Sequence, residues 1–352
     1  MLRIIGTLYA ICMTSLMIAI SIGTRSSDYV LSYVVYHSQL GIGQESPATI
    51  DTATGVSFIT PLRTQFPTTA IRTMAWSPDG AYHLVGLRTI FDNATFMLQG
   101  ADDTQIRYLF ETTSSFFTMP QWSPNSDALV YYERGENESI AQLQYYDLQT
   151  DTLRPIADIP TIGNSRSIAW LPDNEHLVMR ANYSQSDSSF ARINVGDATA
   201  LTYLPVQLNP YERMLPMHDG SGFLLLGGWE IAYVANDALD TPQTLHDAHA
   251  NYTDIALAPD NKNIAFISKL NTGYTGDWVV TLMNLETGTT QNVFRTPTGV
   301  QGLDWSSDSQ RLLFVNVDAP LFNVYTVHAD GTSQRLALEI AYFLSSDVEW
   351  RP

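Results

Sequence analysis

The sequence WSPDG at residues 76–80 recurs along the chain at a nearly constant spacing. Related copies read WSPNS at 122–126, WLPDN at 170–174, PMHDG at 216–220, LAPDN at 257–261, WSSDS at 305–309 and a shortened WRP at 350–352. The steps between turn residues are 46, 48, 46, 41 and 48, counted over Asp79, Asn125, Asp173, Asp219, Asp260 and Asp308. A period of about 40 to 50 residues with several short strands is typical of a β-propeller, whose blades bury their faces against their neighbours.

Each repeat contains the material for four strands. An alternating apolar run follows the motif, as at residues 128–132 and 264–268, and such runs favour half-buried strands. A hairpin comes next, for example YYDLQTDTLRPI from Tyr145, with a tip rich in Asp, Gly and Thr that suits a tight connection. The strand that leads into the motif completes the predicted blade.

The two ends of the chain each contain part of a repeat. The hairpin ATIDTATGVSFIT at residues 48–60 precedes the first motif, and SDVEWRP at residues 346–352 is a leading strand with nothing after it. We expect residues 29–37 and this hairpin to pair with residues 347–350, which removes free strand edges from the ring. The sequence therefore predicts an all-β, seven-bladed β-propeller of four-stranded blades over residues 28–352, the last blade closed by both termini.

The motif residues have structural roles in this interpretation. The indole ring at the end of the inner strand supplies apolar surface between adjacent blades. Pro presets the turn, and Asp followed by Gly or Asn tolerates the left-handed conformation, so the turn acids are expected to form Asx turns and no metal site. The predicted structural tryptophans are Trp76, Trp122, Trp170, Trp305 and Trp350.

These repeats resemble those of the TolB-like, or PD40, family of WD40-like β-propellers, whose signature has the form W-S-P-D-G-x-x-[IL]-[AV]-[FV]. The resemblance covers about residues 28–352, at six or seven positions. It implies a propeller and either a platform that binds partners or the propeller domain of a serine oligopeptidase. The chain departs from TolB itself in having no preceding α/β domain, and Pro216 and Leu257 replace the repeat tryptophan.

The N-terminal segment is apolar. Residues 4–23 contain no charged side chain and follow Arg3, and about 20 apolar residues span the hydrocarbon core of a membrane. We expect residues 1–27 to be an uncleaved signal anchor that forms one hydrophobic helix, with the propeller on the extracytoplasmic side, periplasmic or at the cell surface. The alternative is a signal that is cleaved near Ser21 to give a secreted protein.

Composition narrows the choice of partners. The formal net charge is −18 and only Lys262 and Lys269 are lysines, which argues against nucleic acid and anionic lipid surfaces. Protein partners that are neutral or basic are expected, and no cofactor. No hydrolase elbow, zinc-protease helix or nucleotide-binding loop occurs in the sequence. His246 and His249, with Asp247 between them, are the best candidates for metal ligands, but no third ligand can be placed from the sequence.

The mouth of the central channel is the predicted binding site. Four positions before the repeat tryptophan or its replacement lie Arg72, Thr118, Arg166, Thr253, Gln301 and Ser346, with Arg213 nearby. We expect Arg72, Arg166 and Arg213 to accept a carboxylate, with aromatic anchors at Phe116, Phe117, Tyr211 and Tyr252. In the alternative interpretation, the arginines pair with Asp254, Asp304, Asp347 or Glu349 and join neighbouring blades.

These features favour a membrane-anchored, extracytoplasmic and non-catalytic β-propeller that acts as a protein-binding module or an accessory subunit of a membrane complex. The alternative is a secreted propeller that binds or hydrolyses a small anionic or carbohydrate ligand in its channel. Bare repeats without catalytic motifs favour the first hypothesis.

Overall fold

The computed structural model describes most of the repeat array. The residues described are 30–39, 42–51, 57–59, 70–88, 94–100, 106–112, 118, 120–134, 140–160, 168–182, 188–197, 201–207, 211–247, 251–270, 276–318, 321–341 and 349–352. Before Ala75 the description is limited to the backbone. The predicted anchor, residues 1–27, lies outside the described residues.

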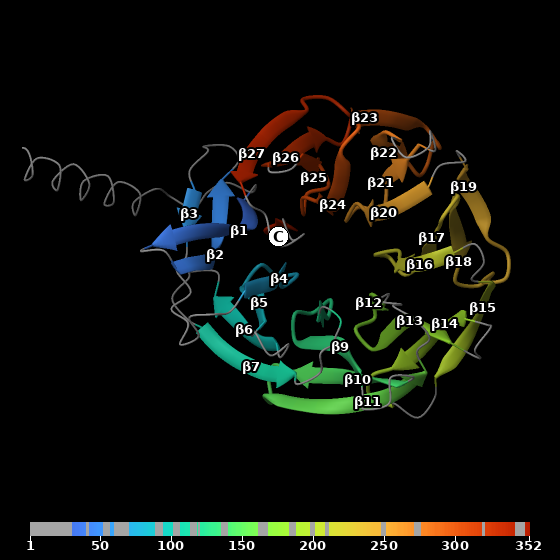
Figure 1. Cartoon of the computed structure of the whole chain (residues 1–352). Helices are drawn as coiled ribbons and strands as arrows, with labels where there is room; N and C mark the ends of the chain where they lie inside the picture. Colours follow the sequence, from blue (N-terminus) through green and yellow to red (C-terminus); the bar gives the residue numbers. More distant parts are fainter. Residues whose placement is uncertain are drawn as a thin grey trace, which may run out of the picture.

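The described strands form seven antiparallel four-stranded sheets arranged in a ring (Figure 1). Six of the sheets each use four strands that follow one another in the sequence. The remaining sheet has the order β28-β1-β2-β3 and combines the two ends of the described chain. Its strands are β1 (Val30–Gln39), β2 (Ile42–Asp51), β3 (Ser57–Ile59) and β28 (Glu349–Trp350).

The six continuous blades follow the motif repeats, and each is named here by its strands. The first two blades comprise β4 (Ala70–Trp76), β5 (Tyr82–Arg88), β6 (Ala94–Gly100), β7 (Ile106–Thr112), β8 (Gln121–Trp122), β9 (Ala128–Arg134), β10 (Ile140–Asp147) and β11 (Thr152–Pro160). The next two comprise β12 (Ile168–Trp170), β13 (His176–Asn182), β14 (Ser188–Asn194), β15 (Thr202–Gln207), β16 (Tyr211–Pro216), β17 (Gly222–Gly227), β18 (Glu230–Ala235) and β19 (Gln243–Asp247). The last two comprise β20 (Asn251–Leu257), β21 (Asn263–Lys269), β22 (Trp278–Asn284), β23 (Thr290–Thr296), β24 (Gly299–Trp305), β25 (Arg311–Asp318), β26 (Leu321–His328) and β27 (Arg335–Ala341).

The expected fold class, a seven-bladed propeller, is corrected to an all-β propeller of six continuous four-stranded blades; the expected hydrophobic helix lies outside the described residues. In the described part of the chain, six four-stranded blades are each built from one continuous repeat. The terminal sheet is a composite rather than a further repeat, and β28 has two partners in β1, Leu31 opposite Trp350 and Ser32 opposite Glu349. In this sheet β1, β2 and β3 come from the beginning of the described chain and β28 from its end.

The apolar core lies between the blades rather than inside any one of them. Tyr132 and Leu143 of blade β8–β11 pack in one cluster with Trp170 and Met179 of blade β12–β15. Similar clusters join four other pairs of adjacent blades, from β4–β7 with β8–β11 to β20–β23 with β24–β27. Alternation along each strand gives every blade two apolar faces, and each face is buried only when the neighbouring blade is present.

The repeat tryptophans also join adjacent blades through a hydrogen bond. The indole N–H of Trp122 donates to the carbonyl oxygen of Ala75 at 3.2 Å. Trp170 donates to Gln121, and Trp305 to Ala256, at the same distance. In each case the acceptor lies one position before the motif of the preceding blade. The bond therefore fixes the position of one inner strand relative to the inner strand of the preceding blade.

The motif turns form a second connection between blades. The fifth motif residue has a positive φ in each of the six full copies, with values between 59° and 72° at Gly80, Ser126, Asn174, Gly220, Asn261 and Ser309. Where this residue has a side-chain oxygen, that oxygen accepts a backbone N–H from the preceding turn. Ser126 accepts from Asp79 at 3.0 Å, and Asn174 accepts from Asn125 at 3.1 Å. Asn261 and Ser309 accept in the same way.

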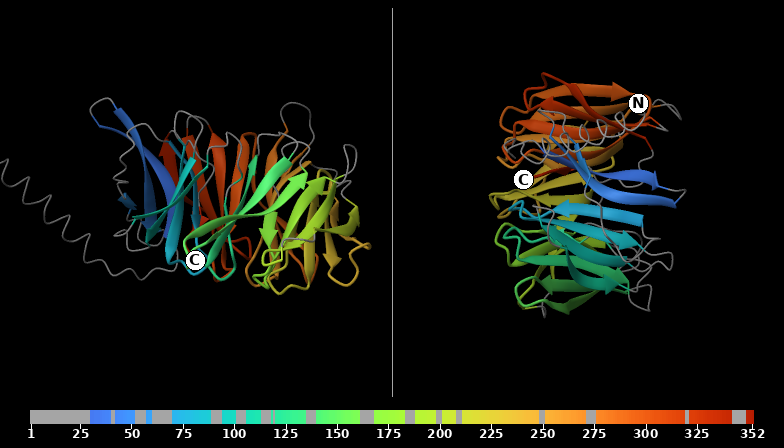
Figure 2. Two further views of the ribbon diagram at one scale, coloured as in Figure 1. Left: turned by 90° about the horizontal axis from the view of Figure 1, so that it is seen from below. Right: turned by 90° about the vertical axis from the view of Figure 1, so that its left-hand side faces the viewer.

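The last residues of the chain pack on the first motif. The Arg351 guanidinium group lies 5.0 Å from the centre of the Trp76 ring, which stacks on His83 with a centroid distance of 4.5 Å. A Cβ atom at Gly80 would lie 3.0 Å from the Pro352 carbonyl oxygen. The C-terminus lies near the centre of the ring in Figure 1 and at one of its faces in Figure 2. The end of the chain thus contacts blade β4–β7, where the repeats begin.

Among the residues that the structure describes, no helix is long and apolar enough to cross a membrane.

A substitution series at Ser126 tests the contribution of the turn-to-turn bond. Ser126→Ala keeps a side chain that is strained at φ 62° but removes the acceptor, so it should lower the free energy of unfolding by about 0.5 to 1.5 kcal/mol. Ser126→Asn keeps an acceptor and tolerates the left-handed conformation, as at Asn174, so its stability should equal or exceed that of the parent. Chemical denaturation measures both; equal stability of the two variants would contradict the assignment.

Candidate functional site

The candidate site lies at the beginning of the inner strands of the blades, where the sequence predicts the mouth of a central channel. Four of these strands have a register shift near their beginning, at Ile71/Thr73 in β4, Tyr211/Arg213 in β16, Tyr252/Asp254 in β20 and Gln301/Asp304 in β24. A β-bulge places an extra residue outside the ladder and redirects the neighbouring side chains. Arg72 and Thr253 are such extra residues, so the position four before the motif is irregular in the backbone as well as in sequence.

Thr118, at the corresponding position of blade β8–β11, has a structural role. Its backbone N–H donates to the carbonyl oxygen of Tyr132 at 3.0 Å, and its hydroxyl oxygen accepts the N–H of Tyr132 at 2.8 Å. The side chain is buried. Thr118 therefore extends the short inner strand β8 and is not available to a ligand.

Arg213 and Asp254 form an ion pair between adjacent inner strands. The distance from Arg213 Nη1 to Asp254 Oδ1 is 2.5 Å. The Arg213 side chain is 42% exposed and that of Asp254 27%, so solvent screens the pair and its net contribution to stability is about 0 to 1 kcal/mol. Asp254 Oδ1 also accepts the N–H of Ile255 at 2.9 Å, which fixes the carboxylate. For Arg213, the structure therefore agrees with the alternative interpretation, in which an arginine pairs with Asp254 and joins neighbouring blades.

The Arg213 guanidinium group uses one of its nitrogen atoms in the contacts among the described residues. Only Nη1 is engaged among the described residues, although a guanidinium group has five N–H donors in a planar fork. Because the remaining donors lie on a side chain that is partly exposed, a second carboxylate can bind beside Asp254 without breaking the existing bond.

The Tyr252 side chain is buried between blades and is not an exposed aromatic anchor. Its ring is buried and packs edge-on against Phe266, and its hydroxyl group shares a 2.5 Å hydrogen bond with His246 Nδ1. Its backbone N–H donates to the carbonyl oxygen of Gly228 in the turn between β17 and β18. Tyr252 therefore fixes blade β16–β19 against blade β20–β23, and burial lowers the pKa of His246 below its usual value.

Trp229 is a feature that the sequence analysis missed. It is 52% exposed in the turn between β17 and β18, which begins directly after Gly227, the backbone partner of Tyr211. The turn is therefore at the same end of its blade as the first residues of β16. The available signal was the sequence GGWE at residues 227–230, a two-glycine turn too short to bury a large ring.

The other predicted binding residues are less completely described. Arg72 and Tyr211 are placed by their backbones in β4 and β16, without their side chains. Arg166, Phe116 and Phe117 lie outside the described residues. Of the predicted binding residues, Arg213 and Tyr252 are those whose side chains are described, and they lie on neighbouring inner strands.

The predicted tryptophans lie where blades meet. Trp76, Trp170, Trp305 and Trp350 are buried, and Trp122 is half-buried.

The acids of the motif turns accept backbone N–H groups. Asp79 accepts from Ala81, Asp219 from Ser221 and Asp260 from Lys262, at 2.9 to 3.0 Å. These bonds are the Asx turns that the sequence predicted. No group of three or more His, Cys, Asp or Glu side chains in the described part of the chain is placed to hold a metal ion. His249 lies outside that part.

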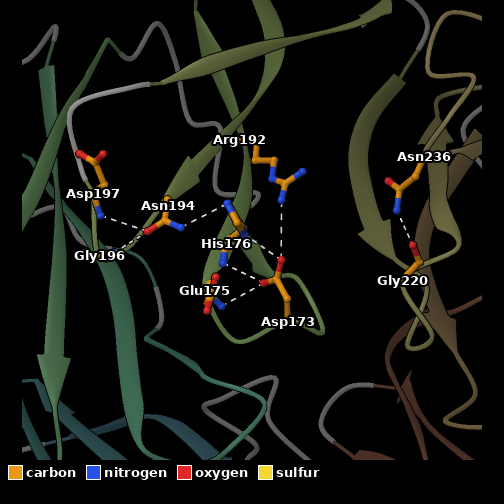
Figure 3. A network of polar contacts seen from close by, with 9 residues as sticks. All are labelled: Asp173, Glu175, His176, Arg192, Asn194, Gly196, Asp197, Gly220 and Asn236. Carbon is orange, nitrogen blue, oxygen red and sulfur yellow. Dashed lines mark hydrogen bonds and ion pairs between the residues drawn. The ribbon is translucent and has the colours of Figure 1, made fainter.

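One turn acid belongs to a larger polar network (Figure 3). His176 Nδ1 lies 2.8 Å from Asp173 Oδ2, and His176 Nε2 lies 3.3 Å from the side-chain nitrogen of Asn194. Burial acts to raise the pKa of Asp173, but the hydrogen bonds from Glu175 and His176 together lower it below the usual value. Both ring nitrogens have partners, since Nδ1–H donates to Asp173 and Nε2 accepts from Asn194. The network resembles a catalytic dyad in composition, but its geometry fixes the turn.

At the motif turns and blade contacts, side chains such as those of Asp79, Thr118 and His176 have backbone or side-chain partners. At the channel mouth, Arg213 and Asp254 remain partly exposed and Arg213 keeps unused donors. This arrangement can bind a carboxylate or a polar protein surface; it contains no nucleophile that is hydrogen-bonded to an activating base.

Comparisons with known proteins agree with the fold. No protein family model matches the chain, and no curated protein matches it in sequence. TolB from Acinetobacter baumannii matches with a TM-score of 0.56 at 13% identity, over 92% of this chain and 83% of that one. A periplasmic gluconolactonase from Pseudomonas aeruginosa matches with a TM-score of 0.66 at 14% sequence identity, over 92% of this chain and 99% of that one. An oligogalacturonate lyase from Vibrio parahaemolyticus matches with a TM-score of 0.59 at 15% sequence identity, over 87% of this chain and 85% of that one. The structure is thus similar to TolB-like β-propeller proteins, all at low sequence identity.

Proposed function

We propose that this chain is a non-catalytic β-propeller that binds a protein partner at the mouth of its central channel. The observation that supports the proposal most is the Arg213–Asp254 pair, which is partly exposed on the inner strands and leaves most of the guanidinium donors unused among the described residues. Arg and Trp are the residue types most enriched at the energetic centres of protein interfaces, and Trp229 lies exposed in the same blade.

The charge of the chain narrows the class of partner. A net charge of −18 attracts partners that are basic overall and repels acidic ones, so neutral or basic partners are favoured. Such a partner can use Asp254 for a cation while one of its carboxylates or carbonyl groups accepts from Arg213. The polar groups of the motif turns are engaged in the fold, which favours a binding role over a catalytic one.

The proposal includes attachment to a membrane on the extracytoplasmic side. The support is in the sequence: Arg3 precedes the uncharged apolar residues 4–23, and this order places the N-terminal end in the cytoplasm. A partner is therefore expected to be a subunit of a membrane complex or a protein that contacts one.

Arg213→Gln tests the binding site. The variant should weaken binding of a partner recovered in mild detergent by at least about tenfold, because a residue at the energetic centre of an interface contributes about 2 kcal/mol or more and about 1.4 kcal/mol is tenfold. Its free energy of unfolding should change by less than about 1 kcal/mol, since the pair is partly exposed. The measurements are partner affinity and chemical denaturation of the same preparation.

Arg107→Gln is the matched control. Arg107 is 44% exposed and pairs with Asp151 at 3.0 Å, but it lies on the outer strand β7. This control should keep full affinity. Equal affinity of both variants, or loss of stability with retained affinity in Arg213→Gln, would contradict a binding site at the mouth. Tight binding of a small carbohydrate or anion, with turnover, would instead support the alternative of a channel ligand.

The membrane proposal has its own test. The chain extracted from membranes should retain residues 4–23, so its intact mass should include them and high salt should not release it. A mature chain that begins near Thr24, recovered without detergent, would show a cleaved signal and contradict the anchor.

A further inference from the structure

Trp229 has the largest exposed fraction, 52%, of the large apolar side chains that the structure describes. It lies in the short turn between β17 and β18, directly after Gly228, where an added Cβ atom would meet nothing within 4 Å. No hydrogen bond, ring contact or cation contact involves the indole among the described residues. Gly, Asn, Asp and Ser are the usual residues of such turns, so the fold does not account for an indole at this position.

The turn that contains Trp229 is attached to the candidate site. The carbonyl oxygen of Gly228 accepts the backbone N–H of Tyr252 in β20 at 3.2 Å, so the turn lies beside an inner strand. Asp254 follows two residues later in β20 and pairs with Arg213 of β16. Because consecutive Cα atoms are about 3.8 Å apart, the Cα atoms of Tyr252 and Asp254 lie within about 8 Å of each other. A partner segment of a few residues can therefore contact Trp229 and the ion pair together.

Carboxylates surround the exposed indole. Glu230 follows Trp229 directly, and its Oε1 accepts the hydroxyl group of Thr244 at 2.9 Å. Asp247 is exposed and lies opposite Glu230 in the ladder of β18 and β19, a position in which Cβ atoms are about 4.5 to 5.5 Å apart. Residues 211–247, which form this blade, contain six acidic residues, one Arg and no Lys. The blade therefore has a negative potential that attracts cations to the ring.

Other aromatic rings of the chain show how a cation is accepted. Lys269 Nζ lies 5.5 Å from the centre of the Trp278 ring, at the end of the neighbouring blade where Asn251 pairs with Lys269. The Arg154 guanidinium group lies 4.6 Å from the centre of the Tyr145 ring. A cation within about 6 Å of the ring centre is attracted by the quadrupole of the ring, and Trp gives the strongest contact of this kind.

Resting on the binding function proposed above, we propose that Trp229 binds a basic side chain, Lys or Arg, of the protein partner. The cation lies over the indole face, with the carboxylates of Glu230 and Asp247 beside it. Arg213 and Asp254 bind polar groups farther along the same partner segment. The site therefore selects a basic segment and disfavours an acidic one.

Binding of a short peptide tests the proposal without knowledge of the partner. The probe is an acetylated and amidated pentapeptide that contains two arginines. The reference is the same peptide with citrulline in place of arginine, since citrulline has a similar shape and no charge. Affinities for the full chain in an uncharged detergent are measured by titration calorimetry at low ionic strength, where the arginine peptide should bind more tightly than the citrulline peptide.

Three variants of unchanged charge separate contact with the ring from general attraction by an acidic protein. Trp229→Leu keeps an apolar side chain but removes the aromatic face, so affinity for the arginine peptide should fall about two- to fivefold. Trp229→Tyr should keep most of the affinity, because its ring also accepts a cation. Tyr82→Leu, at an aromatic residue of blade β4–β7 that is 43% exposed, should bind as the parent does. Equal affinity of Trp229→Leu and the parent would overturn the proposal.

Quenching of tryptophan fluorescence by acrylamide in the parent chain tests the contact even if a variant fails to fold. The arginine peptide should protect part of the emission from the quencher, and the citrulline peptide should not. Equal protection by the two peptides would show that the contact is not with a cation and would also overturn the proposal.

The two proposals can fail separately. Weaker peptide binding in Trp229→Leu, with unchanged partner affinity in Arg213→Gln, would support the cation site and contradict the protein-binding site at the channel mouth. Weaker partner binding in Arg213→Gln, with equal peptide affinity in Trp229→Leu and the parent, would contradict the cation site alone.

Discussion

The contact between neighbouring sheets is the interaction on which the rest of the structure depends. Each blade exposes two apolar faces, and no single blade can bury either of them alone. Tyr131 of blade β8–β11 packs against Phe110 of blade β4–β7 with parallel rings 4.9 Å apart, while Tyr132 faces the opposite neighbour. Consecutive residues of one strand thus belong to different interfaces, which is why the strands need an apolar side chain at nearly every position.

The closed ring extends this constraint to the ends of the chain. Inside the array, an indole N–H and a turn side chain join each pair of tryptophan-containing repeats. Leu257 has no indole, and blades β16–β19 and β20–β23 are joined through Tyr252, whose N–H donates to Gly228, and through the turn bond from His218 to Asn261. At the terminal junction the connection uses Asp304, whose carboxyl group accepts the N–H of Trp350, and Arg351. At Leu257 and at the terminal junction, a different local contact joins the blades.

The sequence predicted the features that depend on local chemistry. Asx turns at Asp79 and Asp260, and the left-handed fifth residue at Asn174 and Asn261, follow from side chains close to the backbone groups they bind. Features that need two blades in contact were beyond it. Burial of Tyr252 depends on His246 and Gly228 approaching from the neighbouring blade.

The candidate site shows the same division. The sequence indicated both Arg213 and Asp254, but it could not say whether they meet, because bulges in β16 and β20 set their positions. Trp229 was missed since a turn gives no periodic signal. Function is constrained less than fold, because the contacts described at the motif turns and between blades serve the fold, while Arg213 is partly exposed.

The central claim is that the two ends of the chain share one sheet, and a disulfide tests it most directly. Ser32 and Glu349 are opposite partners in β1 and β28, at a spacing that a disulfide can bridge. In a Cys12→Ser background, cysteines at these two positions should oxidise to an intramolecular disulfide, seen as one linked peptide by mass spectrometry, whereas cysteines at 32 and 260 should not. Equal or absent linkage in both would contradict closure of the ring by its termini.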